Sequence, residues 1–476
     1  MPAKAAYAVM CVVLATTLAC AGCGAAPNSA ATATAAGTIT PVATAAQAVT
    51  ALPTHAATGG TVDVRGVASY VDQSNTFHAD GLVTNNTGHP VNAIDLHLEL
   101  FRSNGDSVGQ YDFAPQVGEL EPGESWPFDY SQDLTYCSCG STAGWQAKFT
   151  VANSPTPTPG ELVQRLPLDV VNPQITVHAS TGDVFLTGEL VNPSHQPAGI
   201  DQFAAALFDS SGNVAGAADF QVATNLLAPA GDASGADHTP YVIRIKGPVR
   251  AGTRPAYYLK GKVDSNAPDA FRNVANTHLQ LATRFVDADN GVQVIANVTN
   301  AGAKAMGVRL VAGLYDQTGN VLDAAAVNAS IEVLPDGSAP VTLADFANVN
   351  GDSDLLKRVV SATIQLDPAW SGPDSAELDV LPANNETTTL SSHHVTLQGT
   401  VVNTTTRNLD YAAILVVVHD AAGHLVAAAQ TTVIPDKGGP FVPQASLPWT
   451  VDIRLPSQVD ASTLKFDVVA QGRVKQ

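Results

Sequence analysis

One short pattern occurs four times along the 476-residue chain, and its spacing limits the fold more than any other feature. Each copy reads small residue, any residue, Val or Leu, Thr or Val, and then Asn, at 81–85, 188–192, 296–300 and 399–403. The four asparagines lie 107, 108 and 103 residues apart. This period is too long for a solenoid repeat and matches a small globular domain. The sequence therefore predicts four tandem domains.

Each repeat carries the signature of antiparallel strands. In the first repeat Ile94, Leu96, Leu98 and Leu100 alternate with polar residues, which is typical of a strand with one buried face. A turn glycine follows each asparagine after 19 or 20 residues, at Gly105, Gly212, Gly319 and Gly423. We expect a type I turn with a bulge there. Roughly seven short strands per repeat indicate an all-β fold of four tandem immunoglobulin-like (Ig-like) antiparallel β-sandwiches.

The residues before these turns resemble a known family. The third repeat reads Leu314-Tyr315-Asp316 and the second reads Leu207-Phe208-Asp209, each followed by the turn glycine. The first repeat has Arg102 in place of the Asp, and the fourth has His419 in the aromatic position. At these positions the chain resembles the FxLYD domain family, which are short Ig-like sandwiches found in bacterial surface lipoproteins. The resemblance implies a fold and a surface location, and it brings no catalytic residues.

The first 23 residues are typical of a lipoprotein signal peptide. Lys4 supplies the positive charge, and residues 5–21 are apolar or small and uncharged. The segment then reaches Leu18-Ala19-Cys20-Ala21-Gly22-Cys23, which is similar to a bacterial lipobox. We expect Cys23 to carry the lipid, with Cys20 as the alternative, and an unmodified secretory signal as a further reading.

Changes in composition and proline-rich segments predict the domain boundaries. Residues 24–60 are rich in Ala, Thr and Pro and are expected to be a disordered linker. Alternating Pro and Thr at 154–160 predict a stiff second linker. The predicted Ig-like repeats are 61–153, 161–266, 274–368 and 375–474. Residues 354–359 are the only brief helix candidate.

Charge and cysteine content limit the kinds of partner and site that the chain can have. The chain has 43 acidic and 23 basic residues, a net charge of −20, so a role in binding nucleic acid is excluded. Cys137 and Cys139 follow the leader cysteines, and a local disulfide is expected in a secreted protein, with free thiols or a metal as alternatives. Asp287 and Asp289 open a weak candidate calcium loop, but the glutamate that completes such a loop is missing.

No known catalytic motif is present, so we expect no enzyme activity and no cofactor. We expect a non-catalytic cell-surface lipoprotein that is held by its lipid on the extracellular face of the cytoplasmic membrane, or is secreted if it is not acylated. Its repeats would act as spacer, adhesion module or envelope scaffold, with an envelope protein or a glycan as possible partner. The alternative is a specific carbohydrate- or peptide-binding protein with a specialised first repeat. Tryptophans 126, 145, 370 and 449 either stack on sugars or fill the core.

Overall fold

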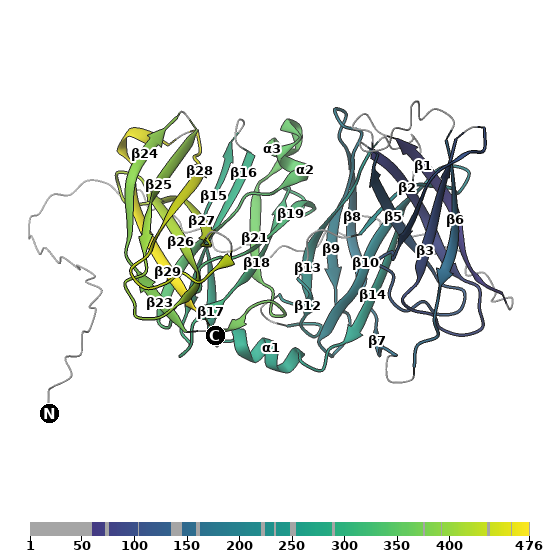
Figure 1. Cartoon of the computed structure of the whole chain (residues 1–476), viewed down its shortest axis with the longest axis horizontal. Coiled ribbons are helices and arrows are strands. Elements are labelled where there is room, and N and C mark those ends of the chain that lie inside the picture. Colours follow the sequence, from purple (N-terminus) through teal and green to yellow (C-terminus); the bar gives the residue numbers. More distant parts are fainter. Residues whose placement is uncertain are drawn as a thin grey trace, which may run out of the picture. The chain divides into compact units, whose positions relative to one another are not determined.

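The computed structural model describes the chain from Gly60 onward, with short gaps (Figure 1). The described residues are 60–71, 76–102, 104–134, 145–158, 162–219, 224–232, 235–247, 254–287, 291–374, 377–391, 393–435, 438–457 and 459–475. In them the fold is all-β, with antiparallel sheets and three short helices, so the predicted fold class is confirmed. The predicted signal peptide and the predicted linker up to Gly59 lie outside the described residues.

The first repeat contains two three-stranded sheets. One has the order β1-β2-β5 and consists of β1 (Val62–Val71), β2 (Thr76–Asn85) and β5 (Ser125–Asp133). The other has the order β4-β3-β6 and consists of β3 (Asp95–Phe101), β4 (Ser107–Phe113) and β6 (Gln146–Asn153). The expected alternation is confirmed, because Ile94, Leu96, Leu98 and Leu100 are all buried.

The second repeat follows the same plan with two extra strands, β7 and β12. Its first sheet is β13-β9-β8, from β8 (Asp169–Val177), β9 (Val184–Val191) and β13 (His238–Ile245). Its second sheet is β11-β10-β14-β7, with β12 beside β10. These strands are β7 (Arg165–Leu166), β10 (Ala198–Phe208), β11 (Val214–Asp219), β12 (Leu226–Leu227) and β14 (Arg254–Val263). The core is filled by side chains from both sheets, including Phe203 and Tyr241.

The third repeat begins after helix α1 (Ala267–Val274). Its sheets are β15-β16-β20 and β19-β18-β21, with a small β17-β22 ribbon. The strands are β15 (Thr277–Asp287), β16 (Gly291–Asn300), β17 (Met306–Gly307), β18 (Arg309–Tyr315), β19 (Val321–Asn328), β20 (Gly337–Leu343), β21 (Ser361–Leu366) and β22 (Gly372–Pro373). Helices α2 (Ala347–Asn350) and α3 (Ser353–Arg358) lie between β20 and β21.

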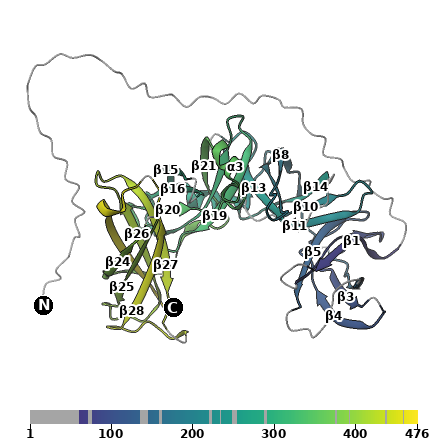
Figure 2. The same cartoon turned by 90° about the horizontal axis from the view of Figure 1, so that it is seen from above.

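The fourth repeat pairs a three-stranded and a four-stranded sheet. Their orders are β24-β25-β28 and β23-β29-β26-β27; Figure 2 labels β24, β25 and β28 of the first sheet and β26 and β27 of the second, and Figure 1 also labels β23 and β29. The strands are β23 (Leu378–Leu381), β24 (Ala383–Leu390), β25 (His394–Val402), β26 (Leu409–His419), β27 (Leu425–Val433), β28 (Ser446–Arg454) and β29 (Lys465–Val474). A 3₁₀ turn spans Ala461–Thr463.

The predicted turns are confirmed in all four repeats. The turn glycines have φ of +90°, +83°, +82° and +88°, a region that side chains other than glycine rarely adopt. The strand register shifts beside each turn, for example between Leu100 and Phe101. The other three shifts fall at the equivalent positions of the later repeats. A register shift beside a left-handed glycine is the bulged hairpin that the sequence predicts.

The helices are only partly as expected. The structure has α3 where residues 354–359 suggested a helix, and the Asp352 carboxylate caps it by accepting hydrogen bonds from the amides of Asp354 and Leu355. Helix α1 occupies a segment where only a break between repeats was expected, and α2 was not expected either. Eight and four residues are too short to show a helical period.

Candidate functional site

The repeated asparagines form one buried corner that recurs in each repeat. Asn85, Asn192, Asn300 and Asn403 are all 0% exposed. In the second repeat Asn192 Nδ2 donates to the carbonyls of Gln196 (2.8 Å) and Ala228 (2.7 Å). Its Oδ1 accepts from the amide of Ser194 at 2.9 Å and from the hydroxyl of Ser194 at 2.7 Å. The asparagine therefore ties the end of one strand to two loops.

The Asn85 and Asn403 corners use the same bonds, and the Asn300 corner uses all but one of them. Asn85 and Asn403 each donate to two carbonyls and accept from the amide and hydroxyl of the threonine two residues later. Asn300 keeps both donor bonds and the amide bond, but Gly302 stands where the others have a hydroxyl. All polar atoms of these amides are used internally, so the corner supports the fold and is not a binding site.

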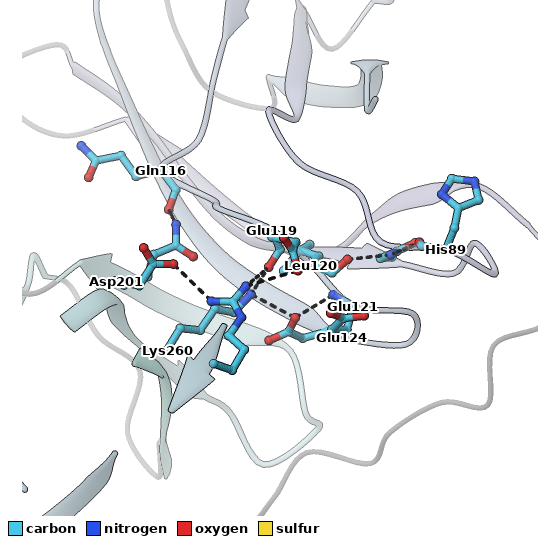
Figure 3. Close-up of polar contacts among 11 residues, drawn as sticks. His89, Gln116, Glu119, Leu120, Glu121, Glu124, Asp201 and Lys260 are labelled. Atoms are coloured by element: carbon cyan, nitrogen blue, oxygen red, sulfur yellow. Dashed lines mark hydrogen bonds and ion pairs between the residues drawn. The ribbon is translucent and has the colours of Figure 1, made fainter. Parts of the chain in front are cut away.

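The junction of the first two repeats contains a network of charged side chains around the buried Lys260, part of which Figure 3 shows. Lys260 of β14 is 5% exposed, and its Nζ donates to the Glu119 carbonyl (2.5 Å) and to Glu124 Oε2 (3.0 Å). The same Nζ lies 4.8 Å from the ring centre of Trp126. Burial lowers the pKa of Lys260, and Glu124 partly opposes this effect. The second repeat thus inserts a cation into the first.

Two more cations hold the same junction. Arg165 donates to the Glu119 carbonyl at 3.0 Å and pairs with Asp201 at 3.1 Å. Lys262 Nζ lies 3.0 Å from the other oxygen of Asp201. Gln202 Nε2 donates to the carbonyl of Gln116 at 3.2 Å. The segment 116–124 of the first repeat is therefore bonded to strands β7, β10 and β14 of the second.

A polar cavity of about 310 Å³ lies on another side of this junction. Asp80, Asp129 and Asp219 line it together with Lys246 and other residues. Burial raises the pKa of Asp80 to about 7 and that of Asp219 to about 7, and the charge of Asp129 adds to both shifts. Asp80 also accepts a bond from the Ala217 amide at 3.2 Å. These carboxyls titrate near neutral pH at a contact between repeats.

The second and third repeats are joined through a buried carboxylate. Asp367 is 0% exposed, pairs with Arg309 and accepts bonds from Asn225 of the second repeat, from the amide at 3.1 Å and from Nδ2 at 2.8 Å. Thr187 donates to the Val321 carbonyl at 2.7 Å. Apolar side chains also meet across this boundary: Phe185 and Val242 with Ala324.

The third and fourth repeats are joined by two hydrogen bonds between the side chain of one glutamine and the backbone of one residue. Gln471 accepts from the Glu332 amide at 3.0 Å and donates to the Glu332 carbonyl at 2.8 Å. Burial and the neighbouring Asp374 carboxyl raise the pKa of Glu332 to about 8, although Arg473 lies nearby. Leu415 and Ala428 of the fourth repeat pack into the core of the third. Every junction thus combines buried polar bonds with apolar contact.

Most of the site residues predicted from the sequence lie outside the described residues: Cys20, Cys23, Cys137, Cys139 and Asp289. Asp287 is described and buried at the end of β15, where its carboxylate accepts a bond from the Ser457 amide of the fourth repeat. Of the tryptophans, Trp126 and Trp449 fill the core, whereas Trp370 is 68% exposed.

Within the described residues, no group of three or more His, Cys, Asp or Glu side chains is placed to hold a metal ion. Among the same residues no helix has the length and apolarity that a membrane span needs.

No protein-family model matches the chain, and neither does any curated protein. Among solved structures it is similar to red sea bream transglutaminase, at 12% identity over 56% of this chain and 39% of that one, with a TM-score of 0.15. Escherichia coli α2-macroglobulin matches at 11% identity over 86% and 28% of the two chains, with a TM-score of 0.11. Amycolatopsis orientalis exo-chitosanase matches at 11% over 56% and 26%, with a TM-score of 0.10. The chain thus spans 39%, 28% and 26% of the lengths of these three proteins.

Proposed function

We propose that the protein is a non-catalytic lipoprotein of the bacterial cell surface, in which four Ig-like repeats form a scaffold or spacer. Cys23 would carry the lipid, with Cys20 as the alternative, and residues 24–60 would tether the repeats to the outer face of the cytoplasmic membrane. The FxLYD-like residues before the turns support the same class of protein.

One observation carries the scaffold role. At each junction a polar side chain of one repeat bonds to the backbone of its neighbour: Lys260 to the Glu119 carbonyl, Asp367 to the Asn225 amide, and Gln471 to the Glu332 amide. Such bonds fix the orientation of two domains, because each is lost if the domains turn relative to one another. A spacer or scaffold needs fixed joints of this kind, whereas independent modules on flexible linkers do not.

Intact-mass analysis of protein extracted from membranes tests the lipid anchor. The proposal predicts a mature chain that begins at Cys23 and carries acyl chains, and a Cys23→Ser variant that is released from the membrane. A Cys20→Ser variant serves as the control and should stay anchored. A mature chain without added acyl mass would contradict the anchor. A Cys23→Ser variant that stays in the membrane, together with a Cys20→Ser variant that is released, would instead assign the lipid to Cys20.

A second function, glycan binding, is favoured by Trp370. Its ring is 68% exposed, and the loop that carries it is held by Asp367, whose carbonyl accepts bonds from the amides of Trp370 and Ser371. An exposed indole on a fixed loop suits stacking on a sugar ring. A Trp370→Ala variant should then lose binding to cell-wall polysaccharide in a pull-down, while the buried Trp126 would have no direct role.

A further inference from the structure

In two repeats the last strand of the second sheet is covered on its outer edge. Strand β7 pairs with β14, matching Leu166 to Gly261 and Arg165 to Lys262. Strand β23 pairs with β29 over four residue pairs. Both covering strands come from residues that directly precede the first strand of their repeat. The second and fourth repeats thus close this edge with their own chain.

The first repeat does not close it. Val62 at the start of β1 pairs with Asn85 of β2, and the Asn86 amide donates to the Thr61 carbonyl at 3.3 Å. The chain therefore belongs to the first sheet from Thr61 onward and does not cross to β6. Within the described residues β6 pairs with β3 alone. Its outer edge presents backbone groups to which a further strand could bind.

A cavity of about 740 Å³ lies between β1 and β6 at this position. Its lining includes the apolar side chains Val62, Val64, Phe149 and Val151, which belong to or pack against the core of the repeat. Asp63, Arg65 and Thr150 add polar groups. An open strand edge beside partly apolar side chains is the kind of site that takes an extended peptide.

The chain itself supplies a suitable occupant. The described residues begin at Gly60, which lines the cavity, and 59 residues precede it. Residues 24–59 contain no Asp, Glu, Lys or Arg, and they include Val49-Thr50-Ala51-Leu52, a mainly apolar stretch with two β-branched residues. Gly59-Gly60 is a pair that favours chain reversal. The eight Cα–Cα steps from Leu52 to Gly60 span at most about 28 Å, more than the roughly 17 Å length of 61–65.

We propose that residues 49–52 and their neighbours add a strand to the open edge of β6, in the cavity between β6 and β1. Because the segment is tethered to Gly60, its effective concentration at the cavity is in the millimolar range, which favours it over a free peptide. The inference does not depend on the lipid anchor. Docking would shorten the free part of the tether that precedes the first repeat.

Hydrogen exchange of the full chain, read by mass spectrometry over 146–153, tests the proposal. A deletion of residues 43–58 should raise the exchange rate of the outward-facing β6 amides tenfold or more. A deletion of residues 26–41 removes the same number of residues of similar composition, and it should leave those rates unchanged. Protection of β2 in both variants would show that the first repeat remains folded.

Adding the deleted segment back as a peptide distinguishes the chain's own segment from a second copy of the chain as the occupant of the cavity. A synthetic peptide of residues 46–56 at millimolar concentration should restore protection of β6 in the 43–58 deletion. The same peptide with Thr50→Pro should not, because proline removes an amide donor from the added strand. Equal exchange in the two deletion variants would overturn the proposal. Protection that rises with protein concentration would also overturn it, since a second copy would then be the occupant.

Discussion

Replacing one corner asparagine tests how much this side chain stabilises its own repeat. In Asn192→Ala two donor bonds, to the carbonyls of Gln196 and Ala228, and two acceptor bonds, from Ser194, are lost. The Gln196 carbonyl still accepts from the Ser194 hydroxyl at 2.8 Å, so the buried bond to Ala228 is the costliest loss. At about 1 kcal/mol for each bond, and more where a buried group is left unpaired, the variant should lose about 4 kcal/mol.

A loss of this size is a large part of the stability of a domain of about 100 residues, which is on the order of 5–15 kcal/mol. Differential scanning calorimetry should therefore show the second repeat melting at least about 10 °C lower in Asn192→Ala. Ser194→Ala is the matched control, since it removes only the hydroxyl and should cost about 1 kcal/mol. If Asn192→Ala melts within about 2 °C of the unmodified protein, the corner does not hold the repeat as described.

Three further predictions concern single positions. In urea unfolding, Lys260→Ala should destabilise the first junction by about 2 kcal/mol. Lys260→Met keeps the packing on Trp126 and should cost less than about 1 kcal/mol. Equal losses in the two variants would refute the packing argument. Because the pKa values of Asp80 and Asp219 are raised in the folded state, the folded protein binds more protons between about pH 4 and 7, and stability falls as the pH rises through this range. Asp80→Asn and Asp219→Asn should each stabilise the protein by about 1 kcal/mol at pH 8 and not at pH 4, and a gain at both pH values would contradict the titration. Gly302→Ser should raise the melting temperature of the third repeat, because it supplies the hydroxyl that the other corners have. The added Cβ would lie 3.0 Å from Asn300 Oδ1, a contact that the other corners accommodate. A lower melting temperature would show that the third corner does not.

The sequence was sufficient to predict those features that depend on local pattern. The row from Ile94 to Leu100 is buried because alternation along a strand is visible in a few residues. Gly105 and its three counterparts adopt left-handed φ because the turn type requires it. The corner asparagines lie at or directly after the end of a strand, where a residue that stabilises turns is favoured, but nothing in the sequence identifies their paired carbonyls some 35 residues away.

The junctions could not be predicted, because their partners are far apart in the sequence. Nothing in the sequence near Lys260 indicates that its ammonium group bonds to Glu119, 141 residues earlier. Asp367 and Asn225 are 142 residues apart. Trp370 differs from Trp126 by lying on a loop outside the sheets, and residue type alone does not distinguish these two positions.

The central claim is that buried contacts fix consecutive repeats relative to one another, and a distance measurement tests it directly. Spin labels introduced through unnatural amino acids at the exposed Gln146 and Ser210 report on the first junction by double electron–electron resonance. The account predicts a single narrow distance distribution that broadens in Lys260→Ala. A broad distribution in the unmodified protein, unchanged by Lys260→Ala, would contradict it.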